Sequence, residues 1–315
     1  TKSAAKDVLE NLETSIYHMD EPISNHVQTV NMLLAKKVAK EATVVLGGDG
    51  GDELFGGYER YYYSSLIDRF QSIPHWLRNS FLTEFLFKTL GRQTSFKLLQ
   101  SPPGADRYLG FFAQKEAIVR SFLKPEFNRP DFTRDYFKAL YFDKVDRDFT
   151  RQFMRTDIYS WLPSESLARS DKMSMAASIE QRVPFLDHRL VEFADRIPVR
   201  YKLGQKGTGV LNIGRNYRGK VILREAMAEF LPTHVLQAQK WGWFSPMAKW
   251  IRGPLLPLVK EVLSSGYNKA TADMFDFEAL NKMLDKHINK EKYALNELWA
   301  VVTFQLWFRA FMAKK

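Results

Sequence analysis

One run of glycines and acidic residues constrains this chain more than any other feature of its sequence. Residues 44–53 read Val-Val-Leu-Gly-Gly-Asp-Gly-Gly-Asp-Glu, so four glycines and three carboxylates directly follow a short, largely β-branched stretch. This pattern predicts a buried strand over residues 43–46 that ends in a tight turn and opens into a helix.

The chemistry of the run favours a site for a metal–nucleotide complex. Glycines let backbone N–H groups approach a polyphosphate closely, and a helix N-terminus adds partial positive charge. Carboxylates suit a hard cation such as Mg²⁺, which can bridge to phosphate oxygens. A solvated turn before an acidic helix start explains the same residues. Neither G-x-x-x-x-G-K-[ST] nor G-x-G-x-x-G is present, so chemistry alone leaves both interpretations open.

Composition narrows the class of protein. The 315 residues suffice for one large or two ordinary domains, and the absence of cysteine excludes disulfides and thiol nucleophiles. The net charge of +10 is spread without a block of five basic residues, which favours a solvated surface with local phosphate binding over nucleic-acid binding. Residues 298–308 are too few to span a bilayer, and no signal peptide is evident. We expect a soluble, cytoplasmic protein with neither nucleic acid nor membrane as a partner.

Hydrophobic periodicity predicts helices along most of the chain. They cover residues 3–18, 26–41, 61–96 with a break at Pro74, two segments within 163–200, and most of 220–315. The apolar face of the second helix is expected to carry Val30, Leu33, Leu34 and Val38. One strand among many helices does not make a sheet, because a parallel α/β layer needs several strands covered by helices.

Four further segments of the sequence help to interpret the glycine–acid run. Residues 16–23 read IYHMDEPI, residues 169–176 read RSDKMSMA, residues 180–187 read EQRVPFLD, and residues 240–246 read KWGWFSP. Together with the glycine–acid run, and in this order, they resemble the synthetase domain of glutamine-hydrolysing asparagine synthetases. The resemblance extends from about residue 12 to the C-terminus.

The resemblance implies a particular, incomplete architecture. It implies an α/β fold that contains the end of a nucleotide-binding parallel sheet of the adenine nucleotide alpha-hydrolase type, followed by a mainly helical region. Residues 1–66 would form the end of the ATP-binding layer, and residues 67–315 the remainder of the same synthetase domain. The family's S-G-G-x-D-S pyrophosphate loop and the N-terminal cysteine of its glutaminase domain are absent from the sequence. We therefore expect a chain truncated at its N-terminus that lacks both parts.

The resemblance also implies an activity and its cofactors. In this family ATP adenylates the side-chain carboxylate of aspartate, and ammonia derived from glutamine then displaces AMP. ATP and Mg²⁺ are thus the expected cofactors, and a small carboxylate such as aspartate is the expected substrate. Gly47 and Gly48 would lie close to the nucleotide, Asp49 matches a position that supports acyl-adenylate formation, and Asp52 matches a Mg²⁺ ligand.

Further candidate residues come from the downstream segments. Lys240 resembles the lysine of the family's K-x-G-F loop, which contacts phosphate and stabilises the charged transition state. Glu165, Arg169, Asp171 and Arg182 are candidates for substrate contacts. The spacing of these charges fits a structural ion network equally well.

Two alternatives to asparagine synthesis stay open. The first is a related amidotransferase that closes a lactam or amidates another carboxylate, for example on a cell-surface sugar. Asp49, where lactam-forming relatives carry tyrosine, weighs against ring closure. The second is a catalytically inert piece that needs a partner to bind ATP. The sequence also leaves open whether the protein is a homo-oligomer.

Overall fold

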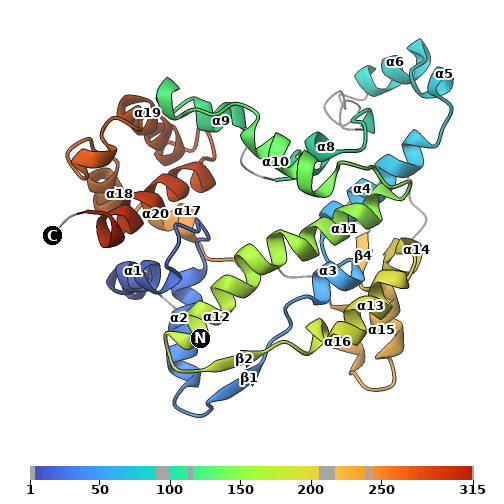
Figure 1. Ribbon diagram of the computed structural model, residues 1–315, viewed down its shortest axis with the longest axis horizontal. Helices are drawn as coiled ribbons and strands as arrows, with labels where there is room; N and C mark the ends of the chain where they lie inside the picture. Colours follow the sequence, from blue (N-terminus) through green and yellow to red (C-terminus); the bar gives the residue numbers. More distant parts are fainter. Residues whose placement is uncertain are drawn as a thin grey trace.

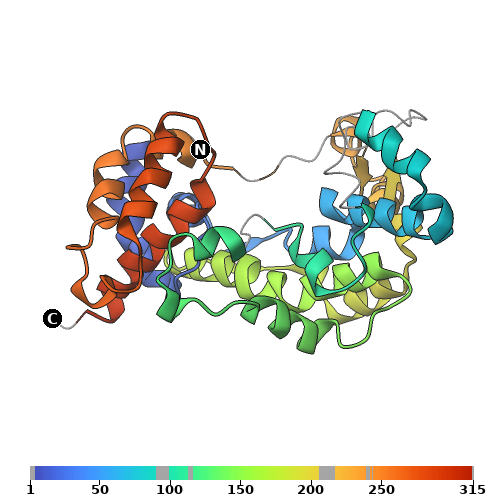
Figure 2. The same ribbon diagram turned by 90° about the horizontal axis from the view of Figure 1, so that it is seen from above.

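The chain forms a two-lobed, mostly helical α/β structure (Figures 1 and 2). The computed structural model describes residues 4–89, 99–112, 116–205, 217–238, 242 and 244–313. One lobe combines the first two helices with the C-terminal helices, so the two ends of the chain pack side by side. A long helical segment and a pair of strands connect this lobe to the other (Figure 1).

The elements of the first half surround the glycine–acid run. In chain order they are α1 (Ala5–Met19), α2 (Gln28–Val38), β1 (Val44–Leu46), α3 (Gly51–Phe55), α4 (Glu59–Gln71), α5 (His75–Arg78), α6 (Phe81–Thr89), α8 (Ala105–Leu109), α9 (Glu116–Arg120), η1 (Pro125–Phe127), α10 (Phe132–Tyr141) and α11 (Phe149–Tyr159).

The second half adds three short strands and the C-terminal helices. In chain order the elements are η2 (Leu162–Leu167), α12 (Ala168–Met175), β2 (Glu180–Arg182), η3 (Pro184–Leu186), α13 (His188–Arg196), α14 (Val199–Lys202), β3 (Leu203–Gln205), β4 (Tyr217–Gly219), α15 (Val221–Ala226), α16 (Thr233–Gln237), α17 (Met247–Ile251), α18 (Leu256–Val262), η5 (Lys269–Thr271), α19 (Phe277–Ile288) and α20 (Leu295–Phe311). No helix within the described ranges is long and apolar enough to cross a membrane.

Strand β1 pairs in parallel with β2, with Val44 opposite Glu180 and Leu46 opposite Arg182 (Figure 1). The strand predicted over residues 43–46 is therefore confirmed, but its predicted burial is wrong. Val44 is 42% exposed and Leu46 is 75% exposed, whereas parallel sheets are usually covered on both faces. Within residues 163–200, where two helices are predicted, the structure adds strand β2 between α12 and α13.

The larger core joins the two ends of the chain. Helix α1 confirms the helix predicted over residues 3–18. It presents Val8, Leu12 and Ile16 at helical spacing, and each is at most 1% exposed. They pack in one apolar cluster with residues of α17 to α20, including the buried Trp299. The division of the chain at residues 66 and 67 stays a prediction.

Helix α2 uses a different face from the predicted one. Its buried residues are Gln28, Thr29, Met32 and Ala35. Met32 packs with Met19 and Met173, since α2 lies between α1 and α12. The predicted face is only partly buried. Its residues divide between the apolar core, which Val30 and Leu33 contact, and the lining of a pocket, to which Leu34 and Val38 contribute.

Helix α11 continues through the π-helical segment η2 into α12, and Figure 1 shows this segment running between the lobes. Proline lacks the backbone N–H that an α-helix needs in its interior, and Pro163 lies in the widened turn. Such π turns are frequent at functional sites. The segment places two serines and an arginine beside the glycine–acid run.

A buried carboxylate ties α11 to the neighbouring helices. Asp157 is fully buried and accepts hydrogen bonds from Arg60 Nε at 3.0 Å, Arg60 Nη2 at 2.7 Å and Tyr108 Oη at 2.7 Å, and also from the Tyr61 hydroxyl. A buried ion pair is sensitive to loss of one partner, because the other charge remains without compensation.

Asp157→Ala is therefore expected to destabilise the fold by about 3–5 kcal/mol, since it leaves the Arg60 guanidinium without its carboxylate. Urea unfolding followed by circular dichroism measures the change. Asp135→Ala removes an exposed carboxylate beside Arg134 and is expected to change stability by less than about 0.5 kcal/mol. Equal effects of the two substitutions would contradict the structural role of Asp157.

Candidate functional site

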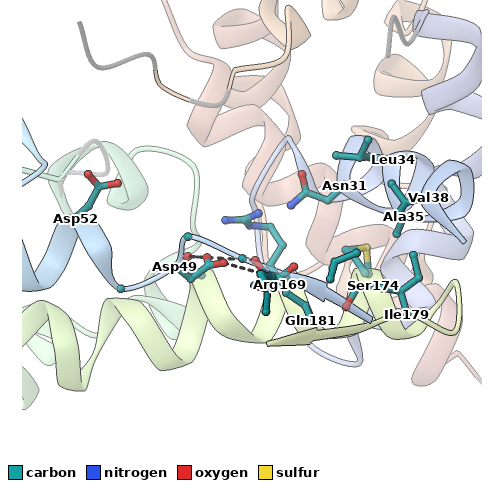
Figure 3. A pocket seen from close by; sticks show the side chains of 18 of the residues that line it. Asn31, Leu34, Ala35, Val38, Asp49, Asp52, Arg169, Ser174, Ile179 and Gln181 are labelled. Carbon is teal, nitrogen blue, oxygen red and sulfur yellow. Dashed lines mark hydrogen bonds between the residues drawn. The ribbon is translucent and has the colours of Figure 1, made fainter. Parts of the chain in front are cut away.

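A pocket of about 700 Å³ opens where β1 ends, between α2 and α12 (Figure 3). Its lining includes an apolar end and a polar end. The apolar end contains Leu34, Ala35, Val38, Met173 and Ile179, and the polar end contains Gly47, Gly48, Asp49, Asp52, Glu53, Tyr58, Ser166, Arg169, Ser170 and Gln181. Five of the candidate site residues named from the sequence thus meet here: Gly47, Gly48, Asp49, Asp52 and Arg169.

Asp49 is held by three side chains from distant parts of the chain. Its Oδ1 accepts hydrogen bonds from Ser166 Oγ at 2.9 Å and Ser170 Oγ at 3.4 Å, and its Oδ2 accepts one from Gln181 Nε2 at 2.7 Å. The carboxylate is therefore fixed beside η2, α12 and β2, as Figure 3 shows.

Two glycines of the turn are required by this packing. A Cβ on Gly47 would lie 2.3 Å from Gln181 Nε2, so a side chain there would displace the bond to Asp49. Gly50 has a φ of +85°, and a Cβ there would lie 2.2 Å from a methyl carbon of Leu186. Gly48 differs, since it has open space where a Cβ would lie.

Asp52 lies one helical turn further and is directed away from Asp49 (Figure 3). Its Oδ1 is 2.9 Å from the ammonium of Lys220. Among the described residues no group of three or more histidine, cysteine, aspartate or glutamate side chains could hold a metal ion. As they stand, these residues do not fit a resident metal ion, because the one carboxylate assigned to it already has a cationic partner.

Arg169 brings positive charge to the pocket and is oriented by a buried glutamate. Its Nε donates a hydrogen bond to Glu165 Oε1 at 2.7 Å, and Asn25 Nδ2 donates to the same oxygen. The Arg169 and Glu165 side chains are only 12% and 13% exposed, which favours a fixed geometry.

The other substrate candidates lie outside this pocket. Glu165 lines a neighbouring cavity of about 360 Å³ whose wall is mainly aromatic, with Tyr108, Phe112 and Trp161 among its residues. Asp171 is exposed on α12. Arg182 is 62% exposed and pairs with Glu180 at 2.8 Å. Within the described residues, the Glu165 side chain contacts the pocket residue Arg169, whereas Arg182 and Asp171 contact pocket residues only through their backbone. The Arg182 carbonyl accepts a hydrogen bond from the Gly47 N–H at 2.7 Å, and the Asp171 carbonyl accepts one from the Ser174 hydroxyl at 3.0 Å.

Lys240 lies outside the described residues, but its segment reaches the pocket. Gly242 lines the cavity, and Ser245 Oγ lies 2.9 Å from Nδ1 of His26 and donates to the His26 carbonyl at 3.1 Å. Burial lowers the pKa of His26. The neutral imidazole therefore anchors the segment that follows Lys240.

A buried acid completes the polar end. Glu53 is 2% exposed, and its Oε1 accepts a hydrogen bond from the Tyr58 hydroxyl at 2.8 Å. Burial raises the pKa of the Glu53 carboxyl, and the bond from Tyr58 opposes that rise. Burial and the nearby Glu53 also raise the pKa of Tyr58, so its phenol remains a hydrogen-bond donor.

Sequence reasoning missed several residues that hold the site. Ser166 and Ser170 are spaced by four positions, which places them on one helix face and was a usable signal. Gln181 and Lys220 carried no such signal, because their relation to the acidic run exists only in three dimensions. Tyr58 lies beyond the run and has no distinctive spacing, whereas Glu53 is one of the three carboxylates of the run and had no separate role assigned to it.

A short parallel strand pair, a glycine–acid turn and the surrounding helices define a mixed α/β, mostly helical domain with a polar pocket at the turn. The chain belongs to the asparagine synthase family, because the family model of that description matches residues 2–309. The resemblance inferred from the sequence motifs is thereby confirmed.

Curated relatives agree with this assignment. The chain is 26% identical over 303 residues to asparagine synthetase (glutamine-hydrolyzing) 1 of Bacillus subtilis, covering 96% of this chain and 46% of the relative. It is 29% identical over 317 residues to a putative asparagine synthetase (glutamine-hydrolyzing) of Mycobacterium tuberculosis, covering 98% and 46%. It is also 24% identical over 324 residues to amidase chry2 of Gibberella zeae, covering 96% and 47%. The chain thus spans about half the length of the curated relatives it matches.

The raised pKa of Glu53 predicts a pH-dependent effect of Glu53→Gln. The folded state holds the proton more tightly than the unfolded state, whose pKa is about 4.5. The contribution of the Glu53 carboxyl to the free energy of unfolding is therefore fully present below the pKa of the unfolded state. It is lost as the pH rises through the pKa of the folded state. Because the amide does not titrate, the variant should become more stable relative to wild type as pH rises.

Urea unfolding at several pH values between about 4 and 8 measures this difference, because proton linkage appears as a pH-dependent unfolding free energy. Glu278→Gln, at an exposed position of α19, is the matched control. A difference between Glu53→Gln and wild type that is constant or declines with pH would contradict the burial argument.

Proposed function

We propose that this chain provides part of the active site of an ATP-dependent amidotransferase of the asparagine synthetase type. In this proposal a carboxylate, aspartate in the first instance, is adenylated by ATP and then amidated by ammonia derived from glutamine. Mg²⁺ would arrive bound to the ATP phosphates. The single observation that carries the proposal is the turn in which Ser166 and Gln181 hold the Asp49 carboxylate. The family model that matches nearly the whole chain supports it.

The geometry of the pocket supports nucleotide binding at this turn. The apolar end, with Leu34 and Ile179, suits a base, and the glycine turn suits the phosphates because Gly48 has open space beside its Cα. Arg169 supplies a fixed positive charge where negative charge develops on phosphate or on a tetrahedral carbon. Lys240 would add a second positive charge, from the segment that Ser245 anchors.

The exposure of the strand pair supports the proposal that this chain holds only part of a nucleotide-binding sheet. Val44 and Leu46 are apolar yet exposed on the outer face of β1. Parallel sheets are rarely uncovered, so we propose that further strands of a nucleotide-binding layer complete this one. Those strands, the pyrophosphate loop and the glutaminase domain would be supplied by sequence that corresponds to the rest of the relatives.

One of the relatives supports a second candidate function. Amidase chry2 of Gibberella zeae does not carry the name of an asparagine synthetase, yet it matches 96% of this chain. We therefore keep a related amidotransferase, acting on a carboxylate other than aspartate, as the alternative substrate class. A chain that binds no ATP by itself is the second alternative.

Carboxylate-dependent exchange of pyrophosphate into ATP tests the proposal. The assay compares the 315-residue chain with the longest open reading frame that contains it, using aspartate and other acids. Aspartate-dependent exchange in the longer protein is the expected result. Exchange with another acid alone would assign the alternative substrate class, and no exchange with any acid would overturn the enzyme proposal.

Asp49→Asn, in the protein that shows exchange, is expected to reduce the exchange rate about 10²-fold. The amide has only one oxygen, so it cannot accept hydrogen bonds from both Ser166 and Gln181 as the carboxylate does. A displacement of an active-site side chain by about 1 Å can lower a reaction rate by this factor. Asp285→Asn, at an exposed position of α19, is the matched control. An unchanged rate in Asp49→Asn would contradict the role assigned to the turn.

A further inference from the structure

The aromatic cavity beside the pocket has the size and the wall of a ligand site. Its volume of about 360 Å³ lies within the range of cavities that bind small molecules. Tyr136 and Ser164 in its wall are exposed, so the cavity opens to solvent. Six of its ten lining residues are aromatic: Tyr108, Phe112, Tyr136, Phe137, Tyr141 and Trp161.

Three hydroxyl groups of this wall already donate to protein acceptors. Tyr108 Oη donates to Asp157 Oδ1 at 2.7 Å, and Tyr141 Oη donates to the Tyr159 carbonyl at 3.3 Å. Ser160 Oγ donates at 2.6 Å to a carbonyl of the preceding helical turn. A hydroxyl has a single proton, so these three groups have none left to donate to an anionic ligand.

The charged group of the wall is the Glu165 carboxylate. Its Oε1 accepts hydrogen bonds from Arg169 and Asn25, whereas its Oε2 is buried and has no hydrogen-bond partner among the described residues. Buried polar atoms are nearly always hydrogen-bonded, so this oxygen favours a ligand that brings a donor. The indole Nε1 of Trp161 is a buried donor in the same state, and an acceptor elsewhere on the ligand would satisfy it.

Two rings of the wall already interact with a cation. The Arg60 guanidinium lies 5.4 Å from the ring centroid of Phe112 and 5.7 Å from that of Trp161. Its charge is balanced by Asp157, as the Glu165 charge is by Arg169. Since these charges are balanced in pairs, the ring faces and the free carboxylate oxygen determine which ligand is preferred, and both favour a cation.

We propose that this cavity binds a small organic ammonium ion, with the ammonium at Glu165 and an apolar body among the aromatic rings. Cation–π attraction and a charge-assisted hydrogen bond act on the same group. The ammonium shares the Glu165 carboxylate with Arg169, so the ligand is placed to influence the pocket at the glycine turn. The inference goes beyond the proposed function and requires neither ATP nor a carboxylate substrate.

Isothermal titration calorimetry of the 315-residue chain with 2-phenylethylamine hydrochloride tests this inference. One molecule should bind per chain. The alcohol 2-phenylethanol, which has a hydroxyl in place of the ammonium, should bind about tenfold more weakly. Glu165→Gln removes the negative charge and Tyr136→Ala removes one ring, so each should weaken binding of the ammonium about three- to tenfold.

Tyr201→Ala is the matched control, because Tyr201 and Tyr136 are both 49% exposed and Tyr201 does not line the cavity. Thermal unfolding checks that each variant is folded, and Tyr136→Ala alone decides the outcome if Glu165→Gln is not. The inference would be overturned by a lack of saturable binding, by equal binding of the ammonium and the alcohol, or by unchanged binding in Tyr136→Ala. Because no ATP is present, failure of the exchange assay would leave this result standing.

Discussion

The Asp49 carboxylate is the interaction on which the candidate site depends. It joins the turn after β1 to Ser166 of η2 and to Gln181 of β2, which lies 132 residues away in the sequence. Hydrogen bonds to a charged acceptor are stronger than neutral ones. These hydrogen bonds connect the turn to η2 and to β2. Arg169 lies at the pocket because η2 and α12 pack against the turn.

Around the Asp49 carboxylate, charged and polar side chains are arranged in pairs that contact each other. Arg169 is oriented by Glu165, Asp52 by Lys220, and Glu53 by the Tyr58 hydroxyl. Each pair fixes a polar side chain at or beside the pocket, which is the preorganisation that charge-stabilising sites require. The pairs explain how the chain orients these side chains.

The fold could be predicted only where the signal is local. The strand and turn around Gly47 follow from β-branched residues and glycines, and the buried face of α1 follows from its spacing. Strand β2 could not be predicted, because Glu180, Gln181 and Arg182 are polar and their pairing with β1 is made across the fold. The resemblance implies Asp52 as a metal ligand, and its contact with Lys220 could not be predicted, because Lys220 lies far along the sequence.

A double-mutant cycle between Asp49 and Gln181 tests the central claim most directly. It compares the unfolding free energies of wild type, Asp49→Ala, Gln181→Ala and the double variant. A charge-assisted hydrogen bond predicts a coupling energy of about 1–3 kcal/mol between the two positions. A coupling energy indistinguishable from zero would contradict the account, because the turn would then not depend on this bond.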